Sequence, residues 1–249
     1  KAALDFGVFM SKRVCLLVLS VVLAGCAGSP QQGIGSQQVT RIDALGHMCF
    51  LIQNSIGSRI LTNPFYPGTT GYKISRDPRP NAILVTNETR DSNNVFLTDA
   101  SPQVFRGSMA VGTNNATGTT VLGIPTWATD TEGSISNQNL VFSWKQDGMR
   151  FAFLGKLQRD LTRAEAERIG EVDLLFMPVG MPSALRDSER ISIINQLRPM
   201  VIVPMGSSSA RSAFATKFRD VVRLPGRSFI ISKNTLPRQP YPRVVLLSY

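Results

Sequence analysis

Histidine is the scarcest chemically versatile residue in this 249-residue sequence, which contains only His47. Cysteine occurs three times, at Cys15, Cys26 and Cys49. Zinc sites are built mostly from several histidine or cysteine ligands, so this scarcity argues against a zinc centre. Cys15 and Cys26 lie in or beside an N-terminal apolar stretch, which leaves Cys49 alone. The sequence therefore predicts no disulfide framework and a buried, structural Cys49.

Two further absences narrow the class of protein. The apolar run from Val14 to Ala24 is well short of the roughly 20 residues that a transmembrane helix needs. The Gly-x-Ser-x-Gly pattern of serine hydrolases does not occur anywhere in the chain. These absences disfavour a permanent membrane span and a conventional serine nucleophile.

The N-terminal stretch has the pattern of a secretion signal. Met10 is followed by Ser-Lys-Arg, the apolar run, and then Leu23-Ala-Gly-Cys26. The last four residues match a bacterial lipobox, which predicts that Cys26 becomes the lipidated first residue. An ordinary cleaved signal followed by a chance cysteine is the alternative. Residues 1–9 are interpreted as lying upstream of the true start.

The regions after the signal predict where the protein works. Residues 26–38 are rich in Gly, Ser and Gln and are expected to form a flexible tether. Removal of residues 1–25 changes the formal charge from +10 to 24 minus 16, or +8. A basic domain in the bacterial envelope favours anionic lipid, an acidic polymer or an envelope protein as partner, and disfavours nucleic acid. Ala27, where inner-membrane lipoproteins often carry aspartate, favours the outer membrane, facing the periplasm.

The remaining chain, residues 39–249, predicts a single α/β domain. Short apolar strands recur in both halves, and Asp147-Gly148 is a favoured tight turn in a hairpin over 139–154. Thr162 and Glu165 form a capping box before a helix over 164–169. Further helices are expected at 188–197 and 212–219, with strands at 172–179, 200–203, 228–232 and 243–248.

The loop after the strand at 81–86 carries a recognisable pattern. It reads Asn87-Glu-Thr89-Arg-Asp91-Ser92 and follows a strand that ends in Thr. This resembles the metallo-β-lactamase superfamily, in which such a strand is followed by His-x-His-x-Asp-His and these side chains hold zinc. By this resemblance Asp91 matches the aspartate. Asn87, Thr89 and Ser92 stand where the family has histidines.

Other segments resemble the branch that contains L-ascorbate-6-phosphate lactonase. Gly46-His47-x-x-Phe-Leu-Ile matches a strand of that branch, and Asn63-Pro-Phe matches a segment in which Asn63 replaces a second-shell aspartate. Val172 to Gly180 matches a further motif. Gly155-Lys156 stands where relatives have Gly-Asp. Pro204-Met-Gly206 stands where relatives have Pro-Met-His, and Ala128 lies near a position at which the family often has histidine.

The resemblance implies an αββα sandwich of two sheets with a degenerate metal site. We expect zinc to be lost and no cofactor to be bound. His47 is expected to be a hydrogen-bonded core residue rather than a ligand. We also hypothesise that the Lys156 ammonium lies beside Asp91 and takes over the electrostatic role of the metal, with Asn87 and Thr89 completing the hydrogen bonds.

Two functions are compatible with this pattern. The first is a non-catalytic lipoprotein that binds or scaffolds in the envelope. The alternative is a hydrolase with an atypical or metal-free site, in which Ser92 or one of Ser207–Ser209 is the nucleophile and Lys156 the base. Ser207–Ser209 are otherwise expected to be a loop with a helix-capping serine. Arg106, Arg211 and Arg223 are interpreted as solvated surface charges.

Overall fold

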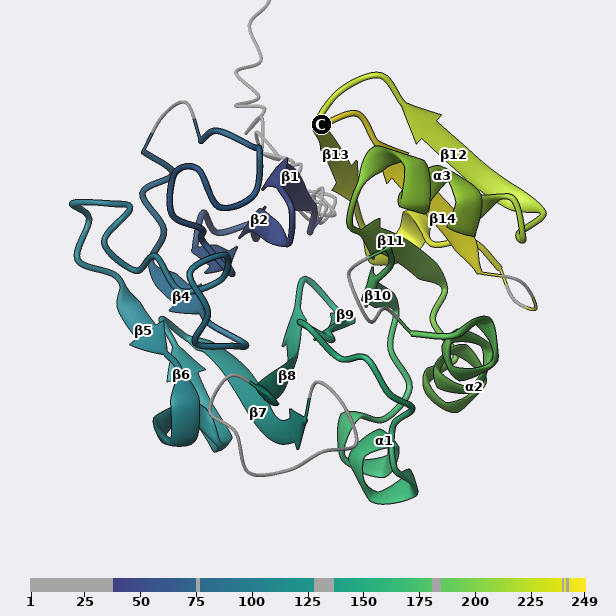
Figure 1. Cartoon of the computed structure of the whole chain (residues 1–249), viewed down its shortest axis with the longest axis horizontal. Coiled ribbons are helices and arrows are strands. Elements are labelled where there is room, and N and C mark those ends of the chain that lie inside the picture. The colour runs from purple at the N-terminus through teal and green to yellow at the C-terminus, as the bar shows by residue number, and fades with distance from the viewer. Residues whose placement is uncertain (1–37, 75–76, 128–136, 181–184, 239, 241) are drawn as a thin grey trace, which may run out of the picture. The chain divides into compact units, whose positions relative to one another are not determined.

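A computed structural model describes residues 38–74, 77–127, 137–180, 185–238, 240 and 242–249 (Figure 1). The signal and most of the tether, residues 1–37, therefore lie outside the described residues, as does Cys26. Within the described part of the chain, no helix combines the length and apolarity that crossing a membrane would require.

The domain is built on two sheets. The first sheet, called sheet A here, has the strand order β13-β1-β2-β3-β4-β5. Its strands are β1 (Thr40–Gly46), β2 (Cys49–Gln53), β3 (Arg59–Thr62), β4 (Ala82–Leu84), β5 (Gln103–Phe105) and β13 (Ser228–Ile231). The three strands β3, β4 and β5 run parallel. The carboxyl ends of these three strands therefore lie at the same end of sheet A.

The second sheet, sheet B, has the order β12-β14-β11-β10-β9-β8-β7-β6. Its strands are β6 (Gly112–Ala116), β7 (Thr119–Trp127), β8 (Gln138–Gln146), β9 (Met149–Phe153), β10 (Leu174–Pro178), β11 (Val201–Met205), β12 (Asp220–Leu224) and β14 (Arg243–Leu247). Strands β9, β10, β11, β14 and β12 are mutually parallel.

Apolar side chains from both sheets form the central core. Phe50 of β2 packs against Phe153 and Phe176 of sheet B, with ring centroids 6.5 and 4.9 Å apart. A second core lies on the other face of sheet B, under helices α1 (Arg163–Ile169), α2 (Asp187–Leu197) and α3 (Ser208–Ala215). The almost wholly apolar sequence of β10 is explained by this two-sided burial. The predicted two-sheet α/β sandwich is confirmed.

The outer face of sheet A is covered differently. Its apolar cluster includes Cys49, Leu61 and Phe65, and side chains from the segments after β3 and β4 pack on it. None of the α-helices in the described ranges packs there, although the αββα expectation implies one. Cys49 is fully buried, as predicted, and burial raises the pKa of its thiol well above the usual range.

Local turn chemistry fixes several boundaries. Asp147 and Gly148 both have positive φ, 48° and 73°, as the predicted hairpin turn between β8 and β9 requires. The Thr162–Glu165 capping box starts α1. The predicted helix at 212–219 is wrong in its bounds, because α3 begins at Ser208, where Ser207 caps its N-terminus by accepting from the Ala210 N–H.

Candidate functional site

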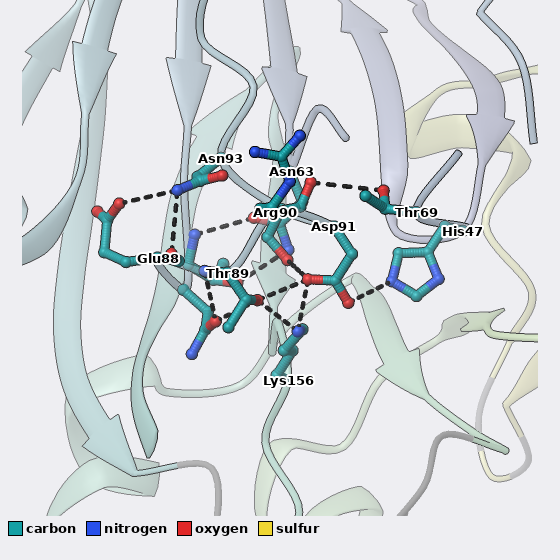
Figure 2. Close-up of polar contacts among 12 residues, drawn as sticks. His47, Asn63, Thr69, Glu88, Thr89, Arg90, Asp91, Asn93 and Lys156 are labelled. Carbon is teal, nitrogen blue, oxygen red and sulfur yellow. Dashed lines mark hydrogen bonds and ion pairs between the residues drawn. The ribbon is translucent and has the colours of Figure 1, made fainter. Parts of the chain in front are cut away.

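The candidate site lies where loops from both sheets meet at the ends of their strands. The loop after β4 supplies Asp91, the segment after β9 supplies Lys156, and the turn between β1 and β2 supplies His47. Figure 2 shows these three side chains converging on one another. Strand ends of an α/β sheet are a common place for polar groups to converge, because the backbone ladder ends there.

Asn63 anchors the start of the site loop. Its side-chain amide donates to Thr86 Oγ1 at 2.8 Å, and its Oδ1 accepts from the Thr86 backbone N–H at 2.9 Å. Both residues are buried. Asn63, which stands at the position matched to the family aspartate, is neutral, and its two hydrogen bonds join the end of β3 to the end of β4.

Asn87 and Thr89 shape the loop itself. Asn87 Oδ1 accepts from the Thr89 backbone N–H at 3.0 Å, which forms an Asx turn, while its amide donates to the Gln138 carbonyl at 2.6 Å. The Thr89 hydroxyl lies 2.6 Å from Asn87 Oδ1 and 2.5 Å from Asp91 Oδ1. Since a hydroxyl has one hydrogen, it donates to one of these oxygens at a time.

Lys156 is held in place by its backbone. Its N–H donates to Asn139 Oδ1 at 2.8 Å, and the Asn139 amide donates to the Leu154 carbonyl at 3.0 Å. At Gly155, with φ of 61°, an added Cβ would lie 2.5 Å from Thr86. Only glycine allows this approach of β9 to the site loop. The sequence analysis missed Asn139, and nothing in its local sequence distinguishes it.

The Lys156 ammonium lies 2.6 Å from Asp91 Oδ1 and donates to Thr89 Oγ1, also at 2.6 Å. Figure 2 shows the ammonium between these two oxygens. The hypothesised juxtaposition of Lys156 and Asp91 is confirmed in its geometry. Burial by itself would raise the pKa of Asp91, but contacts with His47, Lys156 and Thr89 and the charge of Lys156 hold it well below its usual range.

His47 is placed differently from the prediction. It lies in the turn between β1 and β2, with φ of 54°, because Gly46 and His47 together reverse the chain there. Its Nε2 is 3.4 Å from Asp91 Oδ2, and this long contact lacks hydrogen-bond geometry. The side chain is 15% exposed. His47 is therefore a neighbour of the site rather than a hydrogen-bonded strand residue.

The other matched positions do not add chemistry to this cluster. Ser92 is fully buried, and its hydroxyl is 3.3 Å from Asp91 Oδ1. Gly206 has φ of 143°, and an added Cβ would lie 1.8 Å from the Val179 carbonyl oxygen. The backbone at the family's histidine position thus leaves no room for any side chain. Ala128 lies outside the described residues.

Two of the three arginines differ from the prediction of solvated charges. Arg211 is buried, stacks 3.7 Å from the Tyr249 ring centroid, and donates to the Leu247 carbonyl at 2.7 Å. Arg106 pairs with Glu88 beside the site, where Arg106 Nε donates to Glu88 Oε1 at 3.0 Å. Sequence reasoning missed these partners because they are distant along the chain. Arg223 is exposed, as expected.

The fold is a two-sheet sandwich with polar loops at its strand ends. A comparison with protein families identifies the class of protein that has this fold. Residues 41–206, more than half of the chain, match the family described as beta-lactamase superfamily domain. The chain therefore belongs to the metallo-β-lactamase superfamily. A comparison with curated proteins found no match.

Solved structures share the fold. A candidate zinc-dependent hydrolase of the superfamily from Thermotoga maritima is 24% identical, with a TM-score of 0.66, and the match covers 84% of this chain and 98% of that one. A candidate metal-dependent hydrolase from Parabacteroides distasonis is 14% identical, with a TM-score of 0.56 and coverage of 74% and 90%. YhfI from Bacillus subtilis, a metallo-β-lactamase fold protein, is 9% identical, with a TM-score of 0.53 and coverage of 78% and 99%.

These comparisons correct the prediction that the protein takes no cofactor. The Thermotoga neighbour is described as zinc-dependent and the Parabacteroides neighbour as metal-dependent, so metal chemistry accompanies this fold. Missing ligands at matched positions do not establish that a cofactor is absent. At the Asp91 cluster itself the donors do not fit a metal, because an ammonium contacts the carboxylate. The described residues also contain no group of three His, Cys, Asp or Glu side chains placed so that they could hold a metal ion.

Proposed function

We propose that this chain is a non-catalytic binding protein on the metallo-β-lactamase fold. The observation that carries the proposal is the position of Lys156. Its ammonium contacts Asp91 Oδ1 and the Thr89 hydroxyl, so the carboxylate that relatives use for chemistry is engaged in an internal ion pair. A carboxylate compensated in this way is a weak general base, since its pKa is held low.

A cavity beside the ion pair supports a binding role. It has a volume of about 290 Å³, close to the lower limit for small-molecule sites. Its wall combines apolar and polar side chains, among them Val111, Trp127 and Leu140 on one hand and Asn87, Glu88 and Gln138 on the other. Among the described residues of this wall, Glu88 is the one ionisable side chain, and Arg106 pairs with it. This lining suits a small, mainly apolar ligand with one or two hydrogen-bonding groups.

Binding can be tested with a neutral aromatic dye, N-phenyl-1-naphthylamine, whose fluorescence rises in apolar surroundings. We expect saturable binding that Ser108→Phe weakens about tenfold, because Ser108 lines the cavity and phenylalanine would fill it. Met109→Phe is the matched control, since Met109 lies in the same turn, is 86% exposed and does not line the cavity. Equal weakening by both variants, or binding that does not saturate, would contradict a defined site.

The absence of catalysis needs its own experiment. Hydrolysis of bis(p-nitrophenyl) phosphate and of a simple lactone is compared between the parent and Asp91→Asn, each with and without added Zn²⁺. We expect no difference between the two proteins under either condition. A parent rate clearly above that of Asp91→Asn would refute the non-catalytic proposal.

One observation keeps the metal-free hydrolase as a second candidate. The hydroxyl beside Lys156 belongs to Thr89, at 2.6 Å, rather than to the predicted Ser92 or to the serines at the start of α3. A hydroxyl next to a neutral lysine amine is the arrangement of a nucleophile and its base, so this role requires Lys156 first to lose the proton that it carries in its pair with Asp91. If hydrolysis occurs without metal, Thr89→Ala should abolish it and Ser92→Ala should not. The reverse result would exclude this dyad.

We further propose that Cys26 carries a lipid that anchors the domain in the bacterial envelope, with the outer membrane as the favoured location. The lipobox and the polar tether support this proposal. Replacing Cys26 with serine should move the protein from the membrane fraction to the soluble fraction. Unchanged fractionation would overturn the anchor.

A further inference from the structure

A groove with an excess of basic side chains lies on the outer face of sheet A, over β1 and the start of β13. It has a volume of about 350 Å³, and its wall includes Arg41, Asp43, Lys73, Arg227 and Ser228. Three of these side chains are cationic and one is anionic. The groove is distinct from the Asp91 cluster, since the two share no residue.

The single carboxylate among the described residues of the groove wall is already neutralised. Asp43 accepts from Arg41, with an N–O distance of 2.8 Å, and from the Ser228 hydroxyl. Lys73 and Arg227 are both exposed, and neither has an ion-pair partner among the described residues. The groove therefore presents two uncompensated cations, together with an Arg41 side chain that is 48% exposed.

An exposed isoleucine lies beside Arg41. Ile230 of β13 is directly opposite Arg41 of β1 in the antiparallel register, so both side chains are on the same face of sheet A. Ile230 is 63% exposed, whereas its neighbour Ile231 points into the core and is 6% exposed. A large apolar side chain on a surface that also carries cations suits the interface of an anionic membrane.

The position of this surface in the chain supports the same partner. Strand β1 begins at Thr40, immediately before Arg41. Fourteen residues, 26–39, separate the proposed lipid from this strand, and a chain of that many residues spans at most about 50 Å. A membrane that holds Cys26 would therefore be within reach of Arg41.

We propose that Arg41, Lys73, Arg227 and Ile230 form a membrane-contact surface that binds the headgroups of anionic phospholipids. The cations contact headgroup phosphates, and Ile230 enters the boundary with the acyl chains. This surface would orient the domain on the membrane. The choice of a membrane as the partner rests on the proposed lipid anchor, but the contact surface consists of different residues.

The test measures co-sedimentation of the full chain carrying Cys26→Ser with vesicles of phosphatidylcholine alone or with 30% phosphatidylglycerol. The substitution removes the lipid, so failure of the anchor and failure of the surface are distinguishable. Since each Lys or Arg near an anionic membrane contributes about 1 kcal/mol, or roughly fivefold in affinity, Lys73→Gln with Arg227→Gln should weaken binding to the anionic vesicles about 25-fold. Residues 14–24 are present in every variant, so their contribution cancels.

The matched control is Lys145→Gln with Arg168→Gln, two exposed cations of sheet B and α1 that remove the same net charge. Little loss in this control, together with the 25-fold loss above, supports the surface. Similar losses in both double variants would show that net charge alone drives binding and would overturn it. Release of the parent from vesicles by millimolar glycerol 3-phosphate would also overturn it, in favour of a site for a soluble phosphate.

Discussion

Two lysine–aspartate pairs in this domain have nearly the same length but different surroundings. Lys156 Nζ lies 2.6 Å from Asp91 at the candidate site, and Lys233 Nζ lies 2.7 Å from Asp173, just before β10. The Lys156 side chain is 13% exposed and that of Lys233 is 52% exposed, whereas the carboxylates run the other way, at 23% for Asp91 and 11% for Asp173. The distance alone therefore does not distinguish the pairs, whereas the access of the lysine to water does.

The partners of the two aspartates differ as well. Asp91 is contacted by the side chains of Thr89, Ser92 and His47, and the Lys156 ammonium is its nearest cation. Asp173 also accepts from the Arg150 backbone N–H at 2.8 Å, so it keeps a hydrogen bond if its lysine is removed. A buried pair is costly to break because one charge is left behind, while an exposed pair is replaced by water. The first pair should therefore matter to the fold and the second far less.

The largest expected effect is that of Lys156→Ala. We expect a loss of about 2 to 4 kcal/mol in the free energy of unfolding, because Asp91 would lose its nearest cation in a partly buried cleft. The measurement is urea unfolding followed by far-UV circular dichroism. A loss below about 1 kcal/mol would show that Asp91 finds water or another partner when Lys156 is absent.

A double-mutant cycle sharpens the comparison. Asp91→Asn and Lys156→Met, alone and combined, should give a coupling energy of about 1 to 3 kcal/mol. The same cycle at Asp173 and Lys233, with Asn and Met, should give under about 1 kcal/mol. Equal coupling energies at the two sites would mean that burial does not set the strength of these pairs.

The change in unfolding free energy at acid pH should be a smaller effect of the Asp91–Lys156 pair than the two effects above. Its pKa in the folded protein lies below the usual value of about 3.9, so its contribution is fully present above pH 4 and is lost as the pH falls below that. Other paired carboxylates also lose their contribution at low pH, so the informative quantity is the difference in acid destabilisation between the parent and Lys156→Ala. Between pH 5 and pH 2 the parent should lose about 1 kcal/mol more than Lys156→Ala does. Parallel pH curves would argue against the pair as the cause of the shift.

The smallest effect is expected at the pair whose lysine is exposed. Lys233→Ala should change the free energy of unfolding by less than about 1 kcal/mol, because water can replace the ammonium and Asp173 retains its backbone donor. Urea unfolding under the same conditions as for Lys156→Ala gives the direct comparison. A cost equal to that of Lys156→Ala would remove the distinction drawn here.

Much of the fold could be predicted from the sequence, because it depends on local patterns. The Asp147-Gly148 turn, the Thr162–Glu165 capping box and the apolar strand β10 each follow from a few neighbouring residues. The strand that begins near residue 81 was predicted for the same reason. The contact between Asp91, in the loop after that strand, and Lys156 was inferred from a family resemblance rather than from a local pattern, and the geometry agrees with it.

Tertiary structure alone decided which polar groups are buried and what they contact. Asn139, which positions the Lys156 backbone, and Arg211, which is buried against Tyr249, have no distinguishing local pattern, since their partners lie far away in the sequence. Gly206 has no room for a side chain because the Val179 carbonyl lies against it. Long-range packing sets these environments. The sequence by itself determined the strands, the turns and the residue types available for chemistry, whereas only the packing of the two sheets decided which of those residues meet.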